Sequence, residues 1–329
     1  MDVYNVVTLE TVQKAASTLS GHVMMTPVQT CETLDLLSGR RLFLKCENFQ
    51  KSGSFKFRGA LNAVSRLVSS HAATPHQVKV VVSSTGNFGC GMAMAAKLQG
   101  VTTHVVMPSS CPEYKKRTVL SYGANLTQCE PAAQDIAQTV RQVQHATGAI
   151  FISGAEHPDV ISGHGTMGLE LLRQVRNLDA VVMPVGTGGM LSGVSVIIKS
   201  IRPEIRVYGA EPEVANDAAM SLSSGERCTF SRFPQSIADG LNGNIGTVPW
   251  TYIRSNVDDI FTVSEDEIKI AMRLVWERMK LVVEPSGVVG LAAALSDSFK
   301  ARAGGCKNVA VILSGGNVDL SKLSEFLQM

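Results

Sequence analysis

The sequence predicts an α/β protein made of two doubly wound domains with mostly parallel sheets. From residue 78 onward, short apolar segments of strand length alternate with longer segments of helical period. Several of the apolar segments end in loops rich in glycine, serine, threonine and asparagine. The chain has 329 residues, which is more than one domain of about 100–200 residues accounts for.

The N-terminal part of the chain precedes this regular alternation. Apolar residues recur at helical spacing around Thr8, which is a suitable N-cap residue. Helices are expected over 7–20, 32–38 and 58–68, and a strand over 41–46. Lys56 therefore lies at or near the N-terminus of a helix. The positive end of the helix dipole there helps to bind an anion and disfavours an ammonium group.

The alternation continues to residue 152 and defines the smaller domain. Strands are expected over 78–82, 101–107, 125–129 and 149–152, and helices over 92–99, 111–122 and 131–147. Alternating strands and helices at this spacing indicate a parallel sheet with helices on both faces. We place this domain at residues 79–156, on the substrate side.

The rest of the chain repeats the pattern. Strands are expected over 180–184, 207–211, 260–263 and 309–313, and helices over 164–175, 189–199, 265–279 and 285–299. Residues 221–234 have little periodicity and are expected to form a surface loop. Residues 1–78 and 157–329 are assigned to a larger, cofactor-binding domain. In such sheets ligands bind beyond the carboxyl ends of the strands.

The composition is that of a globular protein that binds small molecules. Hydrophobic residues make up 45% and charged residues 18%, and the formal net charge of +2 provides no strongly basic surface for nucleic acid. No apolar run reaches the roughly 18 residues that cross a bilayer, and residues 1–5 lack the features of a signal peptide. The seven cysteines are scattered, so free thiols are expected. We expect a cytoplasmic protein without nucleic-acid or membrane partners.

Residues 52–59 contain the candidate nucleophile, Lys56. Phe55 and Phe57 flank it, small residues precede it, and the segment follows the expected strand over 41–46. A lysine in such surroundings is partly desolvated, which disfavours its charged form and leaves a neutral amine that can attack a carbonyl. The pattern favours a Schiff-base lysine. A surface lysine at a strand-to-helix junction is the alternative.

Three loops follow expected strands and could each hold part of a ligand. The glycines of Gly186-Thr187-Gly188-Gly189 would let backbone N–H groups approach a phosphate. The loop over 83–89 offers hydroxyls, backbone donors and a carboxamide to a small carboxylate or a ring hydroxyl. The third loop is Ser314-Gly315-Gly316-Asn317. The first two loops also have the composition of turns without a ligand.

Residues 211–217 form a candidate metal-binding segment. Glu211, Glu213 and Asp217 place three carboxylates after an expected strand. Such oxygen ligands suit a hard divalent cation, Mg²⁺, Mn²⁺ or Ca²⁺. An acidic, solvated loop is the alternative. His157 and His164 are expected to be structural rather than metal ligands.

The loops and the segments around them resemble one family of enzymes. The segments are Lys45-Cys46-Glu47, Phe49-Gln50-Lys51, Gly53-Ser54-Phe55-Lys56, Arg58-Gly59-Ala60, Ile237-Ala238-Asp239-Gly240, residues 275–280, Glu284-Pro285 and residues 313–317. This set is similar to the fold type II pyridoxal-phosphate enzymes, which share the fold of the tryptophan synthase β chain. Within that group the chain is most similar, almost end to end, to the serine racemase and serine/threonine dehydratase family, and above all to its eukaryotic racemases.

The resemblance implies a site for pyridoxal 5'-phosphate. Lys56 would form the Schiff base with the cofactor and act as the base on one face of the substrate Cα. Phe55 would pack against the cofactor ring, Asn87 would bond its hydroxyl group, and Ser314 would meet its pyridine nitrogen. The phosphate would be held by Gly186, Thr187, Gly188, Gly189 and Met190. A neutral serine at the ring nitrogen goes, in the family, with elimination and racemisation.

The resemblance also implies effectors. Glu211, Ala215 through its carbonyl, and Asp217 match the divalent-cation site of the family, for Mg²⁺ or for Mn²⁺ or Ca²⁺. The nucleotide-binding positions match in part, with Lys115, Tyr122 and Asn317 retained and Cys90 in place of a glutamine. ATP as an effector and a homodimer are therefore expected from the family.

The substrate cleft is where the sequence departs from the family. The substrate-contacting positions are Ser84, Thr85, Asn87 and Phe88. Thr85 stands where the racemases have the serine that acts on the opposite face of Cα, and it keeps the hydroxyl group. Phe88, Ile136, Ser153 and Ala155 replace a histidine, an arginine, a histidine and an asparagine. Such losses of polar groups can change substrate choice by orders of magnitude.

The resemblance implies a pyridoxal-phosphate-dependent racemase that acts on a small amino acid and also catalyses α,β-elimination to a 2-oxo acid and ammonia. Three alternatives stay open. The first is an L-serine/L-threonine dehydratase with little racemase activity, and the second is a relative that acts on another amino acid. The third is a catalytically silent regulatory subunit that binds the cofactor, against which the intact Lys56 argues.

Overall fold

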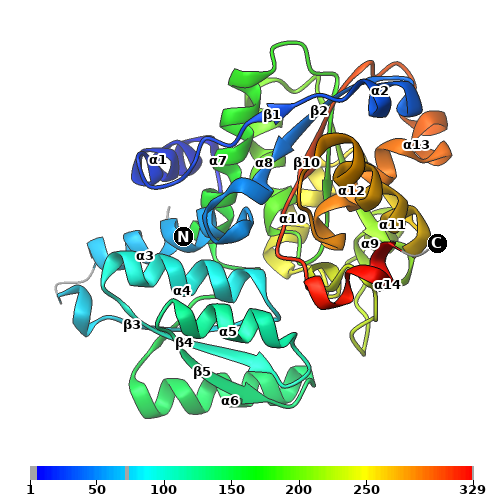
Figure 1. The fold of residues 1–329 in the computed structure, drawn as a ribbon. Coiled ribbons are helices and arrows are strands. Elements are labelled where there is room, and N and C mark those ends of the chain that lie inside the picture. The colour runs from blue at the N-terminus through cyan, green and yellow to red at the C-terminus, as the bar shows by residue number, and fades with distance from the viewer. Residues whose placement is uncertain (1–5, 71–73, 328–329) are drawn as a thin grey trace.

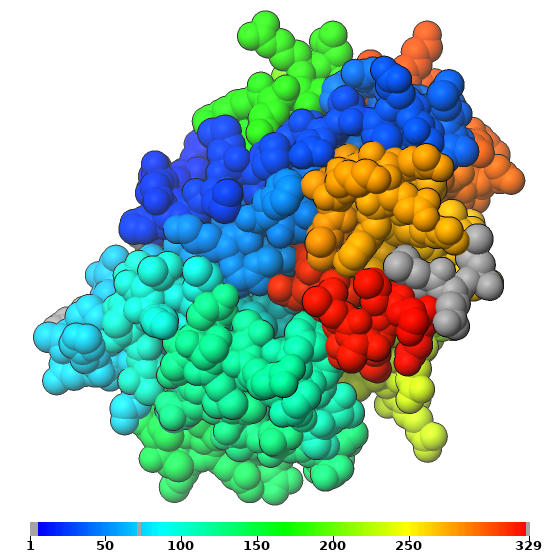
Figure 2. All heavy atoms as spheres, in the orientation of Figure 1, coloured from blue at the N-terminus to red at the C-terminus, as the bar shows by residue number. Residues whose placement is uncertain are grey.

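The computed structural model describes residues 6–70 and 74–327. The absence of a signal peptide was predicted from residues 1–5, which lie outside the described residues. Two β-sheets, each covered by helices, form two lobes (Figure 1). The space-filling view shows the smaller lobe, coloured cyan to green, below the larger one (Figure 2). The predicted α/β class with two doubly wound, mostly parallel sheets is confirmed.

The larger sheet has six strands in the order β1-β2-β10-β7-β8-β9. Their bounds are β1 (Val28–Gln29), β2 (Arg41–Cys46), β7 (Ala180–Pro184), β8 (Arg206–Pro212), β9 (Asp259–Val263) and β10 (Asn308–Leu313). All neighbours are parallel except β1, which is antiparallel to β2. Val309 of β10 pairs with Leu42 on one side and Ala180 on the other, so the last strand lies in the middle of the sheet.

The smaller sheet has four parallel strands in the order β5-β4-β3-β6. Their bounds are β3 (Lys79–Ser83), β4 (Thr102–Pro108), β5 (Asn125–Cys129) and β6 (Ile150–Phe151). These strands span residues 79–151, within the range predicted for the smaller domain. The exact domain boundaries stay a prediction.

The helices cover both faces of both sheets. In the N-terminal half they are α1 (Leu9–Leu19), α2 (Glu32–Ser38), α3 (Lys56–Ser70), α4 (Asn87–Gln99), α5 (Glu113–Ser121) and α6 (Ala133–Thr147). The later ones are α7 (Pro158–Gln174), α8 (Gly189–Ile201), α9 (Asp217–Ser224), α10 (Thr247–Asn256), α11 (Glu265–Leu274), α12 (Pro285–Leu295), α13 (Asp297–Arg302) and α14 (Leu323–Leu327). In Figure 1, α4 and α5 lie on one side of the small sheet and α6 on the other.

Local signals in the sequence explain many helix ends. The Thr8 side chain accepts a hydrogen bond from the N–H of Thr11, which confirms Thr8 as the N-cap of α1. Ser264 and Glu267 form the same reciprocal capping arrangement at α11. Gly100 ends α4 in the left-handed conformation that glycine adopts without strain. Lys56 is the first residue of α3, as predicted.

Separate apolar clusters pack against the two faces of the larger sheet. One contains Val182, Val311 and residues of α11 and α12, and the other contains Val181, Ile312 and residues of α7, α8 and α10. Because successive residues of a strand point to opposite faces, a strand that is buried on both sides is apolar throughout. This explains why β7 and β10 could be recognised as continuous apolar runs.

A buried ionic network joins the end of β2 to α3 and α7. The Arg58 guanidinium donates to the carboxylates of Glu47 and Glu170, with distances of 2.7 to 2.9 Å. Lys45 donates to Glu170 Oε2 at 2.6 Å and to the carbonyl oxygen of Thr26 at 2.8 Å. The side chains of Arg58, Lys45 and Glu47 are fully buried. The network therefore fixes the helix that begins with Lys56.

Several expected boundaries were wrong. α4 begins at residue 87 rather than 92, and α7 begins at 158 rather than 164, where His157 accepts a hydrogen bond from the N–H of Asp159 and Pro158 occupies the first helical position. The helix expected over 265–279 becomes π-helical at Val275–Met279, and the one expected over 285–299 is interrupted at Ser296. Residues 221–224, expected in a loop, belong to α9. Strand β1 and helix α10 were not expected.

The cysteines and the helices agree with two further expectations. All seven cysteines are free, and Cys46, Cys90, Cys111 and Cys306 are buried. None of the helices in the described part of the chain is both long and apolar enough to span a bilayer.

Candidate active site

The segment that leads into Lys56 is tied to the loop that follows β10. The N–H of Phe55 donates to the carbonyl oxygen of Ser314 at 3.1 Å, and Ser54 forms an antiparallel bridge with Gly315. The N–H of Gly316 donates to the carbonyl of Gly53 at 2.9 Å. Because β2 and β10 are parallel neighbours, their carboxyl ends lie at the same edge of the sheet. Two of the predicted site segments are therefore in direct contact.

Lys56 lies at this edge with a partly desolvated amine. Its Nζ lies 4.8 Å from the centre of the Phe55 ring. Burial lowers the pKa of Lys56 to about 8, although part of the side chain still reaches solvent. A substantial fraction of the amine is therefore neutral near pH 8, as a nucleophile or general base requires.

The glycine-rich loop connects β7 to the N-terminus of α8. Gly188 has a φ of +87°, and a Cβ there would lie 2.8 Å from Cβ of Pro249, so both the conformation and the space require glycine. A Cβ on Gly186 would lie 3.0 Å from the carbonyl oxygen of Gly240. The first N–H groups of a helix have no partner within it. The loop thus offers backbone donors to an anion.

The loop after β3 is held by its own side chains. The Ser84 hydroxyl accepts from the N–H groups of Gly86 and Gly89, at 3.0 and 2.9 Å. Asn87 Nδ2 donates to Glu284 Oε1 at 2.6 Å, and Asn87 Oδ1 accepts from Asn317 at 2.9 Å. The first turn of α4 is therefore bound to the end of β10, which places Asn87 beside the Lys56 segment.

Close packing of α3 on α4 completes this arrangement. A Cβ on Gly91 would lie 3.1 Å from the backbone N of Phe57 and 3.2 Å from the carbonyl carbon of Lys56. Thr85 lies in the same loop, and its side chain is exposed. The structure thus brings Lys56, Ser314 and the loop over 83–89 together at one place between the two sheets.

Phe88 forms a buried apolar wall beside this loop. It is 6% exposed, and a Cβ on Gly154 would lie 2.7 Å from its ring. The neighbouring Ser153 hydroxyl accepts from the N–H groups of Ala155 and Glu156, at 3.3 and 3.1 Å. Ser153 and Ala155 are thus close to Phe88, whereas Ile136 lies on α6, which packs on the small sheet.

The candidate metal ligands lie at the carboxyl end of β8. Glu211 and Asp217 are buried, with 1% and 2% of their surfaces exposed. Glu211 accepts from the N–H groups of Ala218 and Ala219, and Asp217 accepts from the N–H of Ile245 at 2.7 Å. Burial raises the pKa of both carboxyls, and the charge of Asp217 raises that of Glu211 further.

Ala215 is buried in the short 3-10 helix Glu213–Ala215 between these two carboxylates. Within residues 6–70 and 74–327 there is no group of three or more His, Cys, Asp and Glu side chains that could hold a metal. The candidate site is therefore a pair of carboxylates with a backbone carbonyl near them in the sequence.

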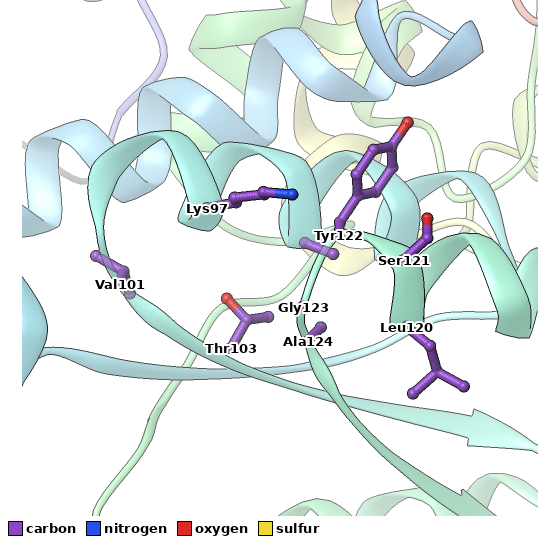
Figure 3. A pocket seen from close by; sticks show the side chains of 9 residues that line it. Lys97, Val101, Thr103, Leu120, Ser121, Tyr122, Gly123 and Ala124 are labelled. Carbon is purple, nitrogen blue, oxygen red and sulfur yellow. The ribbon is translucent and has the colours of Figure 1, made fainter.

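The four nucleotide-binding positions are divided between two places. The Cys90 thiol faces the carbonyl of Lys115, and the carbonyl of Asn317 accepts from the Tyr114 hydroxyl, so these positions adjoin the loop over 83–89. Tyr122 lines a pocket of about 330 Å³ at the amino ends of β4 and β5. Figure 3 shows Lys97 of α4 and Thr103 of β4 with Tyr122 around that pocket.

Glu284 is a buried residue of this region whose role the sequence did not indicate. Burial raises the pKa of Glu284 to about 7, while Lys115 opposes that rise. Lys115 Nζ lies 2.6 Å from Asp239 Oδ2 and 3.9 Å from Glu284 Oε2. The Glu284-Pro285 pair was visible as a motif, but its partners come from distant parts of the chain.

Comparisons with known proteins support one family. The sequence pattern of the family described as "Pyridoxal-phosphate dependent enzyme" matches residues 19–315. The chain is 46% identical to serine racemase of Homo sapiens over 94% of this chain and 91% of that protein. It is 42% identical to β-hydroxyaspartate dehydratase of Paracoccus denitrificans, over 96% and 98% of the two chains. The structure of maize serine racemase superposes with a TM-score of 0.91 at 38% identity. The superposition covers 97% of this chain and 96% of the maize protein.

Proposed function

The chain belongs to the family of pyridoxal-phosphate-dependent enzymes, and we propose that it is an amino acid racemase of the serine racemase type that also catalyses α,β-elimination. Pyridoxal phosphate, when bound, supplies an electron sink that stabilises negative charge at the substrate Cα. One observation carries the proposal. The pKa of the Lys56 amine is lowered to about 8, and Lys56 lies where the segments that follow β2 and β10 meet the loop after β3.

The residues present fit this cofactor. Lys56 provides an amine that is neutral at slightly alkaline pH, and Phe55 provides an apolar ring next to it. The backbone of Gly186, Thr187, Gly188, Gly189 and Met190 would hold the phosphate group at the N-terminus of α8. The Ser54 hydroxyl is buried without a hydrogen-bond partner among the described residues. An unpaired buried hydroxyl is expected at a site where a polar group of a ligand binds.

Ser314 and Asn87 would orient the ring. Among the described residues the Ser314 hydroxyl makes one long hydrogen bond, 3.5 Å to the carbonyl of Ser286, which leaves it able to meet the pyridine nitrogen. The Asn87 amide has one hydrogen bonded to Glu284, and its second hydrogen can be donated to the ring hydroxyl. A neutral serine leaves the ring nitrogen without the charge that a carboxylate would fix on it.

The direction of proton transfer depends on two residues. Lys56 would remove the Cα proton on one face, and the exposed hydroxyl of Thr85 would return a proton on the other. Racemisation follows when Thr85 delivers that proton. When a β-hydroxyl group leaves first, the product is a 2-oxo acid and ammonia. The relatives include a racemase and a dehydratase, which supports both outcomes.

The substrate is a small amino acid, and Phe88 decides which one. Its buried ring replaces the polar group found in the racemases, so a substrate other than serine is the first alternative. A dehydratase with little racemase activity is the second. A silent cofactor-binding subunit is a weaker candidate, because Lys56 and the loops around it are intact.

A substrate panel with two readouts tests the proposal. The holoenzyme is incubated with L-serine, L-threonine, L-aspartate and L-threo-3-hydroxyaspartate, and the D-isomer and the 2-oxo acid are measured separately. Formation of both from one substrate supports the proposal, and 2-oxo acid alone identifies a dehydratase. No spectral change with any amino acid would reject an enzyme. Lys56→Ala should lose the cofactor's visible absorption band and all turnover, whereas Lys79→Ala on β3 should retain both.

The same proposal extends to effectors and assembly. Glu211, Asp217 and the Ala215 carbonyl would bind a divalent cation, Mg²⁺ or Mn²⁺ or Ca²⁺. Burial raises the pKa of both carboxyls, and a cation would favour their charged forms. ATP would act as an effector near Lys115, Asn317, Cys90 and Tyr122. We also propose a cytoplasmic homodimer, which light scattering and cell fractionation would test.

A further inference from the structure

His164 lies on α7 where this helix passes between α3 and α8. Two glycines of α7 allow it to pack closely against these two helices. A Cβ on Gly163 would lie 2.6 Å from the carbonyl oxygen of Arg58 on α3, and a Cβ on Gly165 would lie 2.8 Å from the carbonyl of Gly193 on α8. The residue between these two glycines is therefore held between the helix that begins with Lys56 and the helix that begins with Gly189.

The imidazole of His164 has no hydrogen-bond partner among residues 6–70 and 74–327. The residue is 0% exposed, and among the described residues neither ring nitrogen meets a donor or an acceptor. Burial, with the positive charges of Lys56 and Arg58, lowers the pKa of His164 well below its usual value. A buried polar side chain with no partner is destabilising and needs an explanation. A bound ligand that completes its hydrogen bonds would provide one.

The orientation of the ring indicates where this ligand lies. A Cβ on Gly59 would lie 2.4 Å from Cε1 and 2.7 Å from Nδ1, so this edge faces the first turn of α3. A Cβ on Gly189 would lie 3.7 Å from Cδ2, so the other edge faces the N-terminus of α8. Nε2 is bonded to both Cε1 and Cδ2. It therefore lies between the first turn of α3 and the first turn of α8.

We propose that His164 donates its imidazole N–H to the phosphate group of pyridoxal phosphate. The inference rests on the proposed role of residues 186–190 as the phosphate site. These residues carry no charged side chain, so a bound dianion would have only backbone N–H groups, the Thr187 hydroxyl and the helix N-terminus as donors. A neutral imidazole has one N–H donor, and a nearby dianion favours its protonated form with two.

Phe55 helps to hold the ring in this orientation. Its ring packs edge to face against the imidazole, with the centroids 4.8 Å apart. The same Phe55 ring lies under Lys56 Nζ. His164 and Lys56 therefore both contact the Phe55 ring, as expected for residues that serve the phosphate and the aldehyde, which are attached to neighbouring carbons of the cofactor ring.

The test compares two ligands that differ only in the phosphate group. Apoenzymes of wild type, His164→Leu and His164→Gln are titrated with pyridoxal phosphate and with pyridoxal, and binding is followed by absorbance without substrate. His157→Gln at the N-cap of α7 is the control, because the His157 side chain accepts from the N–H of Asp159 at that helix end. In His164→Leu we expect affinity for pyridoxal phosphate to fall about tenfold to 100-fold, as for the loss of a hydrogen bond to a charged group. His164→Gln should lose less, since it keeps a donor.

Affinity for pyridoxal should change less than about threefold in both variants. Equal losses for the two ligands, or no loss for pyridoxal phosphate, would overturn the assignment. If His164→Leu does not fold, wild-type protein with ¹⁵N-labelled histidine decides the question. The imidazole resonances of His164 should then shift with pyridoxal phosphate and not with pyridoxal, and the same shift with both would reject the proposal. These readouts do not depend on turnover, so they remain valid if the proposed reaction is wrong.

Discussion

Arg58 donates two hydrogen bonds to Glu47, from Nε to Oε2 at 2.8 Å and from Nη2 to Oε1 at 2.8 Å, and both side chains are fully buried. The pairing lowers the pKa of Glu47, against the effect of its burial. Arg58 also binds Glu170 on α7, so one guanidinium connects the first turn of α3 to the helix that carries His164. The position of Lys56, two residues before Arg58, depends on this connection.

Arg58→Ala should therefore destabilise the protein strongly. It leaves the Glu47 carboxylate buried without its partner, which costs about 3–5 kcal/mol. Arg58→Lys should recover only part of the loss, because an ammonium group cannot bind two carboxylates in the same fork-like geometry. Urea denaturation of the apoenzymes would measure both changes.

A surface ion pair provides the control for Arg58. Arg206 contacts Asp258 with more than half of its side chain exposed, and Arg206→Ala should cost less than about 1 kcal/mol. Similar losses in the free energy of unfolding for Arg58→Ala and Arg206→Ala would show that the Arg58 network stabilises the protein no more than a surface ion pair does.

Uptake of the cofactor should depend on pH through Lys56. In the protein without cofactor the pKa of Lys56 is lowered to about 8, so the neutral fraction of its amine is nearly complete above pH 9 and falls about tenfold per pH unit below pH 7. The rate at which apoenzyme and pyridoxal phosphate form the visible absorption band should rise with pH and level off above pH 8. N-acetyl-lysine amide, treated identically, should keep rising to pH 10. Coincident profiles would mean that the protein does not lower the pKa of Lys56.

Thr85→Ala should separate the two reactions. Removing the hydroxyl eliminates the proton donor on the second face of Cα, and racemisation should fall on the order of 100-fold. Elimination needs only Lys56 on the first face and should fall less than about threefold. Thr85→Ser should retain both activities. The D-isomer and the 2-oxo acid are assayed in parallel, and equal losses in Thr85→Ala would count against a two-residue scheme.

Phe88 should control substrate choice. Phe88→Ala opens space beside Gly154, and Phe88→His adds a polar group to the same wall. We expect relative kcat/KM values across the amino acid panel to change at least about tenfold in each variant. Phe233→Ala removes an exposed ring and is the control. If the order of substrates is the same in all four proteins, Phe88 does not contact the substrate.

Stabilisation of the folded protein by a divalent cation should require Glu211. With Mg²⁺ at about 100 times its dissociation constant, the folded wild type gains about 2.7 kcal/mol. Its melting temperature should fall with a chelator and recover with Mg²⁺. Glu211→Gln should show neither effect. Glu213 is exposed, and Glu213→Gln should behave as wild type. A full Mg²⁺ response in Glu211→Gln would place the cation elsewhere.

The features that could be predicted from the sequence are those with a local physical cause. The apolar runs of β7 and β10, the N-cap at Thr8 and the start of α3 at Lys56 all depend on residues close in the chain. The loops after these strands could be assigned to one site because parallel strands end at the same edge of a sheet. Their direct contact, such as the bridge between Ser54 and Gly315, follows from that topology.

The features that were missed depend on distant partners. Helix α10 contains β-branched and aromatic residues with low helix propensity, and its N-terminus is capped by Glu156, which accepts from the N–H groups of Thr247 and Val248. The pKa of Glu284 is raised by burial, and the Glu284-Pro285 motif alone does not indicate that the side chain is buried. His164 is an ordinary interior helix position by its sequence, and only its two unpaired nitrogens distinguish it.

The central place of β10 in the larger sheet has a consequence for the order in which the enzyme is made. β2 and β7 meet only through β10, which is the last strand of the chain and carries Ser314 at its end. A nascent chain that has not yet released residues 308–313 from the ribosome has two unconnected half-sheets and no partner for the segment before Lys56. Domains fold as units once their strands are available. The segment before Lys56 therefore reaches its final position only when residues 308–313 have joined the sheet.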